Sequence, residues 1–274
     1  MALKVLAVAY VVVLALLLWN KTALLYHPTL ASLKELQAAA DQAGMKPWKN
    51  NAGEVIGWVS TPDLGVAAQK CLIFHGNGGM ALDRSDFAKA LQSLSPRGAW
   101  EIYILEYPGY GARPGPMNEE SLVNAGLEAV DLLRQEDHRP VFILGESLGA
   151  GVAAQVAGRR PQQVAGVLLL TPFYNLMTVA QYHYPIFPLQ LILRGNYRSD
   201  IALQNYSGPV AVVLAEQDEV IPPLFGEKLY EEYKGPKKLW KLPGGHNTID
   251  TDPTASWWQD VFDFLTSHAL ITNL

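Results

Sequence analysis

The sequence has almost no cysteine and no excess of positive charge. Only Cys71 occurs among the 274 residues, so an internal disulfide and a cysteine-based zinc site are both excluded. The formal net charge is −5, and no basic stripe with interleaved aromatic side chains is present, so we do not expect a nucleic-acid partner. Internal repeats and low-complexity tracts are also absent. With 49% hydrophobic residues, the chain is long and apolar enough for one large α/β domain with a buried core.

A long uncharged run sets the N-terminus apart from the rest of the chain. Val5–Trp19 is almost wholly aliphatic, and Lys4 and Lys21 bracket it. A bilayer crossing needs roughly 20 residues, and a Lys21 side chain that reaches toward the lipid headgroups would extend the run to about Tyr26. We therefore predict an uncleaved single-pass membrane anchor over residues 1–28, with the extracytoplasmic side favoured for the remaining domain. A cleaved signal peptide and a buried helix are the alternatives.

Strand-like and helix-like segments alternate from residue 50 onward. We expect strands at Glu54–Ser60, Cys71–Phe74, Glu101–Glu106, Val141–Leu144, Val164–Leu170, Val210–Leu214 and Lys238–Leu242. Helices are expected at Ser85–Leu94, from Asn118 to about Asp137, at Ala150–Ala157, at Phe225–Tyr233 and from Asp252 onward. Most of these strands are short continuous apolar runs, as in parallel strands that helices cover on both faces. The pattern predicts a mostly parallel, doubly wound α/β sheet within a domain spanning residues 29–274.

One segment, residues 173–199, interrupts this alternation. It is long, aromatic and punctuated by prolines, and it lies between two strands, at the sheet edge where ligands bind in open α/β sheets. Two interpretations stay open. The segment is either a crossover helix with an irregular entry or a short lid that lines an apolar substrate site.

The most informative motif is Gly145-Glu-Ser-Leu-Gly149, which follows an apolar strand and opens a helix of small residues. Strand, G-x-S-x-G and helix together form the context of a nucleophile elbow, in which a tight turn lifts a serine hydroxyl clear of the backbone. The glycines on either side allow that turn, because larger side chains would clash there. The motif makes Ser147 the candidate nucleophile.

A serine hydroxyl needs a base to take its proton and an acid to orient that base. In doubly wound hydrolases the chain order is serine, acid, histidine. Asp218 follows the strand at Val210–Leu214, and His246 follows the strand at Lys238–Leu242 on a glycine-rich loop. We predict Asp218 as the acid and His246 as the base, with Glu216 and Glu219 as the alternative acids.

Two backbone N–H groups must face the negative oxygen that develops during acyl transfer. Leu148, the residue after the nucleophile, supplies one of them. The other is expected from Asn77 in the glycine-rich loop that follows the strand at Cys71–Phe74. The same loop also has the spacing of a dinucleotide-binding fingerprint, so a nucleotide-binding module is an alternative function. A catalytically silent hydrolase-fold scaffold at a membrane is another.

Five motifs follow the N-terminal apolar run in an order typical of one family. They are Phe74-His-Gly-Asn-Gly-Gly79, Glu106-Tyr-Pro-Gly-Tyr-Gly111, Gly145-Glu-Ser-Leu-Gly149, Asp218-Glu-Val-Ile-Pro222 and Gly245-His-Asn247. On these residues the chain resembles the α/β-hydrolase superfamily, and most closely its Bem46-like, ABHD12/13/17-type branch of membrane-anchored serine hydrolases. The resemblance covers roughly residues 50–270. It implies an eight-stranded α/β-hydrolase sheet and esterase or thioesterase chemistry that needs neither a cofactor nor a metal.

These observations together predict a serine hydrolase that cleaves carboxylic esters or thioesters through an acyl-enzyme intermediate. The expected substrate is a small-molecule or lipid-like ester with an apolar acyl chain, because the chain combines an anchor with an aromatic segment near the site. Tyr110, Phe173 and Tyr184 are expected to contact that substrate. The membrane is expected as a partner through the N-terminal helix.

Overall fold

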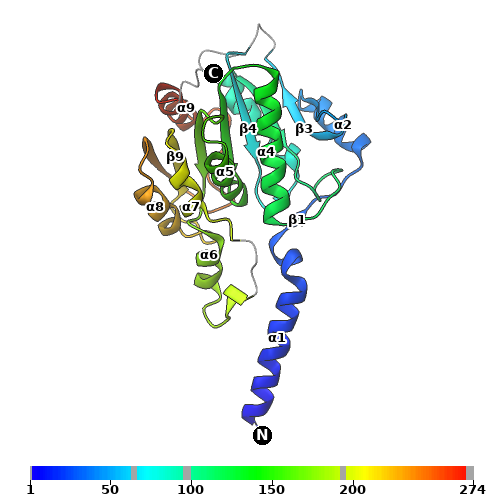
Figure 1. Cartoon of the computed structure of the whole chain (residues 1–274), viewed down its shortest axis with the longest axis vertical. Coiled ribbons are helices and arrows are strands. Elements are labelled where there is room, and N and C mark those ends of the chain that lie inside the picture. Colours follow the sequence, from blue (N-terminus) through cyan, green and yellow to red (C-terminus); the bar gives the residue numbers. More distant parts are fainter. Residues whose placement is uncertain (1, 63–66, 95–99, 192–195, 270–274) are drawn as a thin grey trace.

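A mixed eight-stranded sheet forms the centre of the computed structural model, which describes residues 2–62, 67–94, 100–191 and 196–269 (Figure 1). Its strands are β2 (Lys46–Lys49), β3 (Val55–Ser60), β4 (Gln69–Phe74), β6 (Trp100–Leu105), β7 (Val141–Glu146), β8 (Gly166–Leu170), β9 (Val210–Ala215) and β10 (Lys237–Leu242). The spatial order is β10-β9-β8-β7-β4-β6-β3-β2. Pairing is parallel from β10 to β6, and β3 pairs antiparallel with both β6 and β2. The eight-stranded sheet that the family resemblance implies is therefore confirmed, but the sheet has an antiparallel edge.

Helices cover both faces of this sheet, which explains the continuous apolar strands. The β4 residues Leu72 and Phe74 pack in one buried cluster, and Cys71 and Ile73 pack in a second. The first cluster includes side chains of α4 (Glu119–Glu136), α5 (Leu148–Arg159) and α8 (Pro223–Glu232). The second includes side chains of α2 (Leu33–Gln42), α3 (Ser85–Ser93) and α9 (Trp257–Ser267). Alternate residues of each central strand thus belong to opposite cores, as in a doubly wound domain.

Helix boundaries follow local hydrogen bonds, and one predicted boundary is wrong. The Asn118 side chain accepts a hydrogen bond from the Ser121 N–H at 2.9 Å and begins α4 where the sequence predicts it. The last helix begins at Trp257 and not at Asp252. The reason is that the Asp252 carboxylate accepts hydrogen bonds from Thr254 and holds that stretch as a turn.

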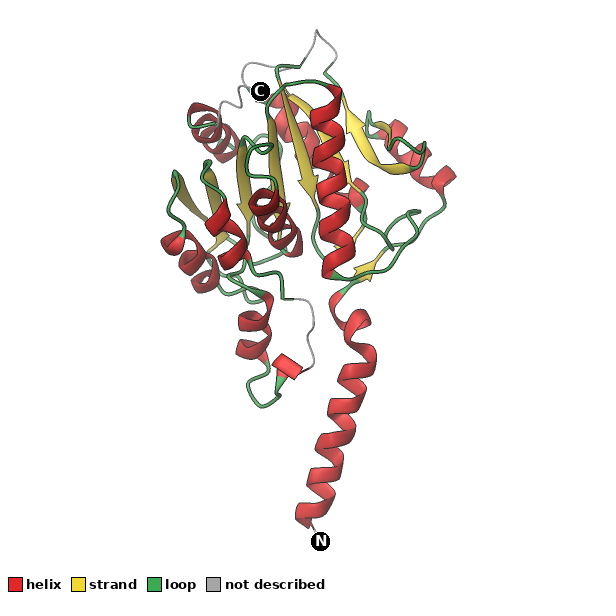
Figure 2. Ribbon diagram, viewed as in Figure 1, coloured by secondary structure: helices red, strands yellow, loops and turns green. Residues whose placement is uncertain are grey.

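The N-terminal helix α1 (Ala2–Leu25) extends away from the sheet (Figures 1 and 2). Among the residues that the structure describes, no helix combines the length and apolar character needed to cross a bilayer. The predicted localisation, a single-pass membrane anchor, is therefore wrong, and the described helix gives no support to the membrane as a partner. The physical reason is visible in the sequence, because the uncharged run between Lys4 and Lys21 is shorter than the roughly 20 residues of a span.

A second, two-stranded sheet follows α1 directly. In it β1 (His27–Pro28) pairs in parallel with β5 (Gly78–Gly79), and a bridge joins Leu30 to Gly111. The chain after α1 is thereby attached to the glycine-rich loop that follows β4.

The segment at 173–199 contains the helix α6 (Leu176–His183) and the 3-10 helix η2 (Leu189–Leu191), with residues 192–195 outside the described part. It emerges at the end of the molecule toward which the parallel strands point, as α1 does (Figure 2). Tyr10 of α1 donates a hydrogen bond to the Ile186 carbonyl at 2.9 Å and stacks on Phe187. Three short helices complete the described elements: η1 (Ala81–Arg84), α7 (Ser199–Ala202) and η3 (Leu203–Asn205).

Candidate active site

Ser147 lies in a strained turn between β7 and α5. Its φ is 54° and its ψ is −118°, a conformation that side-chain-bearing residues rarely adopt. The two flanking glycines are required by close approach. A Cβ atom on Gly145 would overlap with the Gly149 backbone, and one on Gly149 would overlap with the Phe74 carbonyl. The G-x-S-x-G motif therefore folds as the nucleophile elbow that the sequence predicts.

Of the three residues predicted as a triad, His246 lies within hydrogen-bonding distance of both of the others. His246 Nε2 is 2.9 Å from Ser147 Oγ, and His246 Nδ1 is 2.7 Å from Asp218 Oδ2. Their side chains are shielded, since that of His246 is 10% exposed and that of Asp218 is 2% exposed. The tautomer that fits carries its proton on Nδ1, donates it to Asp218 and leaves Nε2 free to accept from the serine hydroxyl.

Backbone N–H groups hold the Asp218 carboxylate in place. Its Oδ1 accepts hydrogen bonds from Val220 at 2.9 Å and Ile221 at 2.7 Å, while Oδ2 faces His246. Glu216 and Glu219, the alternative acids, are both exposed. The geometry therefore favours Asp218 over both of them.

Glu146, directly before the nucleophile, is paired with Arg84 of η1 through its Oε2 and the guanidinium Nε. Both side chains are about one-fifth exposed. A Cβ atom placed on Gly76 would contact both Arg84 Nη2 at 3.8 Å and Ser147 Cβ at 3.7 Å, so Arg84 borders the site. The cation balances the carboxylate beside the serine. Arg84 was not predicted from the sequence, because its partner lies on a distant strand and no motif links the two.

The two predicted oxyanion donors belong to segments next to the nucleophile. Leu148 is the first residue of α5, where backbone N–H groups have no partner within the helix. Asn77 belongs to the loop whose Gly76 approaches Ser147. His75 Nδ1 lies 2.9 Å from the Gly76 carbonyl, so the His75 ring supports the loop from within the core.

The residues predicted to bind substrate have three different environments. Tyr110 is fully buried, and its hydroxyl donates to the Asn77 carbonyl at 2.7 Å. Phe173 is buried against Tyr197 and Gly151 in the core. Neither ring presents a surface that a substrate could contact, which corrects the expectation for both. Tyr184 ends α6 and is 58% exposed, and for this residue substrate contact stays a prediction.

The α6 segment also touches the acid turn, a contact that sequence reasoning did not identify. His183 Nε2 lies 2.9 Å from the Val220 carbonyl, and the Tyr182 ring meets Phe225 edge-on. Since Val220 N–H also binds Asp218, α6 rests directly on the turn that holds the predicted acid.

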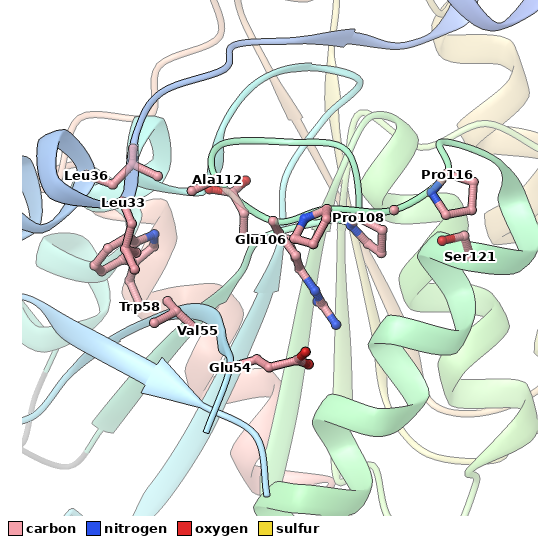
Figure 3. A pocket seen from close by; sticks show the side chains of 13 residues that line it. Leu33, Leu36, Glu54, Val55, Trp58, Glu106, Pro108, Ala112, Pro116 and Ser121 are labelled. Atoms are coloured by element: carbon pink, nitrogen blue, oxygen red, sulfur yellow. The ribbon is translucent and has the colours of Figure 1, made fainter. Parts of the chain in front are cut away.

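A pocket of about 380 Å³ is lined in part by the loop between β6 and α4 (Figure 3). Its walls include Leu36 of α2, Trp58 of β3 and Pro108 of that loop, and the residues that line it do not include the triad. Glu106 links the pocket wall to the active-site loop, because its Oε1 accepts the Ala81 N–H at 3.0 Å and lies 3.6 Å from His75 Nε2.

Two observations bear on cofactors. Within the described ranges, no group of three or more histidine, cysteine, aspartate or glutamate side chains is placed to hold a metal ion. The glycine-rich loop continues into β5 and the short helix η1, whereas a dinucleotide fingerprint runs directly into the N-terminus of a long helix. The loop geometry therefore disfavours the nucleotide-binding alternative.

Curated relatives share most of this chain. An uncharacterized protein of Mycobacterium tuberculosis is 33% identical over 195 residues, which cover 70% of this chain and 67% of that protein. The lysophosphatidylserine lipase ABHD12 of Rattus norvegicus is 29% identical over 202 residues, covering 67% of this chain. The chain matches only about half the length of that lipase, 50%.

Solved structures and a family model agree on the fold. An esterase of Pyrococcus furiosus superposes with a TM-score of 0.64 at 15% identity, covering 89% of this chain and 98% of its own. Est1E of Butyrivibrio proteoclasticus gives 0.63 at 18% identity, covering 77% and 94%. Residues 71–206, which contain the elbow, match the model of the alpha/beta hydrolase family. The chain belongs to the alpha/beta hydrolase family.

Proposed function

We propose that this protein is a serine hydrolase that cleaves carboxylic ester or thioester bonds. The observation that carries the proposal is the continuous hydrogen-bonded chain from Ser147 through His246 to Asp218, with the serine on a nucleophile elbow. This arrangement is the one that acyl transfer requires, because it couples a nucleophile to a base and the base to an orienting acid.

In the proposed first step, Ser147 Oγ attacks the acyl carbonyl while His246 Nε2 takes the hydroxyl proton. Asp218 keeps the imidazole in the reactive tautomer and stabilises the imidazolium that forms. The Asn77 and Leu148 N–H groups face the tetrahedral oxyanion. His246 then returns the proton to the leaving alcohol or thiol, which departs and leaves an acyl ester on Ser147.

In the second step, water hydrolyses this acyl-enzyme. His246 removes a proton from the water, which attacks the acyl carbon, and the same oxyanion donors act again. The serine hydroxyl regains its proton when the carboxylic acid leaves. Every proton in the cycle passes through His246 Nε2, so the reaction needs no group beyond the side chains and backbone described.

An apolar acyl chain is the proposed substrate feature. Tyr182, Tyr184 and Ile186 expose large apolar surfaces on the α6 segment, at 56%, 58% and 72% of their areas, and this segment rests on the acid turn. The lipase name of the ABHD12 relatives points to the same class, single-chain acyl lipids. Rates on p-nitrophenyl esters from acetyl to decanoyl test this feature. We expect kcat/KM to rise with chain length, and a sharp preference for acetyl would contradict it.

Substitution of the nucleophile tests the function itself. Ser147→Ala removes the attacking oxygen and leaves the fold intact, so turnover of p-nitrophenyl butyrate should fall by at least about 10³-fold. Thermal unfolding should stay near that of the parent protein. A variant that retains full turnover would rule out the assignment, and an inert parent protein would favour the scaffold alternative.

A further inference from the structure

The seven residues Leu25–Ala31, here termed the strap, run from the last residue of α1 along the active-site loop His75–Gly79. His27 N–H donates to the Asn77 carbonyl at 2.9 Å, and Thr29 N–H donates to the Gly79 carbonyl at 2.8 Å. In the opposite direction, the Asn77 side-chain amide donates to the Leu25 carbonyl at 2.9 Å. The loop that supplies a proposed oxyanion donor is therefore bound by a segment about 50 residues before it in the sequence.

A turn with two buried tyrosines supports the same loop from the core side. Tyr110 Oη donates to the Asn77 carbonyl at 2.7 Å, and Tyr107 Oη donates to the His75 carbonyl at 3.1 Å. Burial raises the pKa of both phenols well above the ordinary value, so both hydroxyls stay protonated and able to donate. The strap closes this arrangement, because Gly111 N–H donates to the Thr29 carbonyl at 3.0 Å.

These bonds constrain both peptide planes that meet at Asn77. His75 Nδ1 faces the Gly76 carbonyl at 2.9 Å, and that carbonyl belongs to the same peptide plane as the Asn77 N–H. The next plane carries the Asn77 carbonyl, which accepts from both His27 and Tyr110. The direction of the Asn77 N–H is thus determined by contacts outside the loop and by the ring of His75.

We propose that Tyr110, the Asn77 side chain and the strap are positioning groups for the oxyanion hole, so that the N-terminal segment controls transition-state stabilisation. This inference rests on the proposed hydrolase function. An oxyanion donor acts only within a few tenths of an ångström of its correct place, and loss of one donor costs about 10²- to 10³-fold in kcat. Release of one supporting bond should cost part of that effect.

A pair of substrates separates positioning from general damage to the fold. An oxyanion hole stabilises the oxygen of a reacting ester far better than the sulfur of the corresponding thionoester, because its donors bind O⁻ more strongly than S⁻. Displacement of the Asn77 N–H should therefore slow the ester more than the thionoester. A merely structural defect lowers the active fraction and slows both substrates equally, which leaves the ratio of their rates unchanged.

The first two variants each remove one side-chain bond to the loop. Tyr110→Phe deletes the hydroxyl that binds the Asn77 carbonyl, and Asn77→Ala deletes the amide that binds Leu25 while keeping the backbone N–H. For each, we expect kcat on the ester to fall about tenfold with KM changed less than about threefold, and the ester-to-thionoester ratio to fall about fivefold. Tyr206→Phe is the matched control, since Tyr206 Oη donates to the Val164 carbonyl in the core, away from the loop. It should leave the ratio unchanged.

The strap itself is tested by a pair of substitutions at Thr29. Thr29→Pro removes the N–H that binds Gly79, and it follows a residue that is already extended in β1, as a proline requires. Thr29→Val keeps that N–H. The proline variant should lower the ester-to-thionoester ratio, and the valine variant should keep it. Tyr110→Phe, Asn77→Ala and Thr29→Pro each remove a different bond to the loop. If one of them fails to fold, the other two still test the positioning role.

Two failures can be told apart. If the parent protein turns over neither substrate, the proposed function fails and this inference fails with it. If the parent protein hydrolyses the ester while Tyr110→Phe and Asn77→Ala keep both the parent kcat within twofold and the parent ratio, the function stands and the positioning role is overturned.

Discussion

Two hydrogen-bonded groups of titratable side chains occupy opposite ends of the same sheet. At the carboxyl ends of the strands, Ser147, His246 and Asp218 form the proposed triad. At the amino end of β4, the fully buried Lys70 ammonium lies 2.9 Å from Glu136, 3.2 Å from Asp137 and 2.8 Å from the Leu133 carbonyl. Packed helices and strands position both groups, but the two groups differ in whether an atom is left free to react with another molecule.

The two groups differ in the donors and nucleophilic atoms that their internal hydrogen bonds leave available. The three N–H bonds of Lys70 meet three oxygen acceptors, so the cluster has no donor left to use on another molecule. The triad ends instead in a serine oxygen on a strained turn, with a base on one side and partly unpaired backbone donors close by. A saturated cluster stabilises the fold, and a chain with a free nucleophile at its end supports catalysis.

The sharpest test of this difference removes the triad acid's charge. Asp218→Asn keeps the shape of the side chain but favours the wrong tautomer of His246, so kcat should fall about 10³- to 10⁴-fold with little change in unfolding temperature. Glu219→Gln, one residue away and exposed, is the matched control and should stay within about threefold of the parent. Equal losses in the two variants would mean that the acid has been misassigned.

The opposite cluster should respond in stability. Lys70→Ala leaves the Leu133 carbonyl without its donor and removes a buried side chain, which should cost about 2–3 kcal/mol, less than a fully buried pair because Glu136 and Asp137 are partly exposed. The turnover per folded molecule should not change. In the control Lys89→Ala, the exposed pair with Asp86 should contribute less than about 1 kcal/mol. Denaturant unfolding measures the loss of stability in both variants. A loss of turnover in folded Lys70→Ala protein would contradict the view that the Lys70 cluster contributes to stability alone.

The smallest expected effect concerns pH. Partial burial works to raise the pKa of Asp137, but hydrogen bonds from the Arg139 side chain and backbone, together with the Lys70 charge, outweigh it and hold that pKa well below the ordinary value. A carboxyl whose pKa is lower in the folded state stabilises the fold above its unfolded pKa, about 3.9, and this contribution disappears as the pH falls through the folded pKa.

Asp137→Asn should therefore unfold at a lower temperature than the parent protein at pH 7, by a small margin because solvent screens the partly exposed carboxylate. The margin should shrink as the pH falls below about 4. Thermal unfolding from pH 7 to pH 3 measures it. A margin that stays constant over this range would show that the carboxylate's charge contributes nothing.

The sequence was sufficient to predict the placement of residues whose position is set by a local turn or by a strand end. Ser147 needs a glycine-flanked turn, and Asp218 and His246 each follow a strand, so the parallel sheet brings all three to one edge. The edge strand β2 was not predicted, because Pro47 is unfavourable in a central strand and is acceptable here only since β2 lies at the edge of the sheet.

Long-range partners were beyond reach of the sequence. Tyr110 and Phe173 carry the aromatic character of substrate-binding residues, but tertiary packing buries both. In the sequence Lys70 has no feature that sets it apart from other charged residues. Its ion pair with Glu136 of α4 follows from the tertiary fold. The strap lies about 50 residues before the loop that it binds, and no motif in the sequence predicts their hydrogen bonds.

Covalent labelling would show whether Ser147 is the nucleophile. The intact protein would be treated with a fluorophosphonate, and the modified peptide would be located by mass spectrometry, alongside Ser147→Ala and His246→Ala. We expect one adduct on Ser147 in the parent protein and loss of that adduct in both variants. A folded parent protein that stays unmodified, or an adduct on another serine, would contradict it.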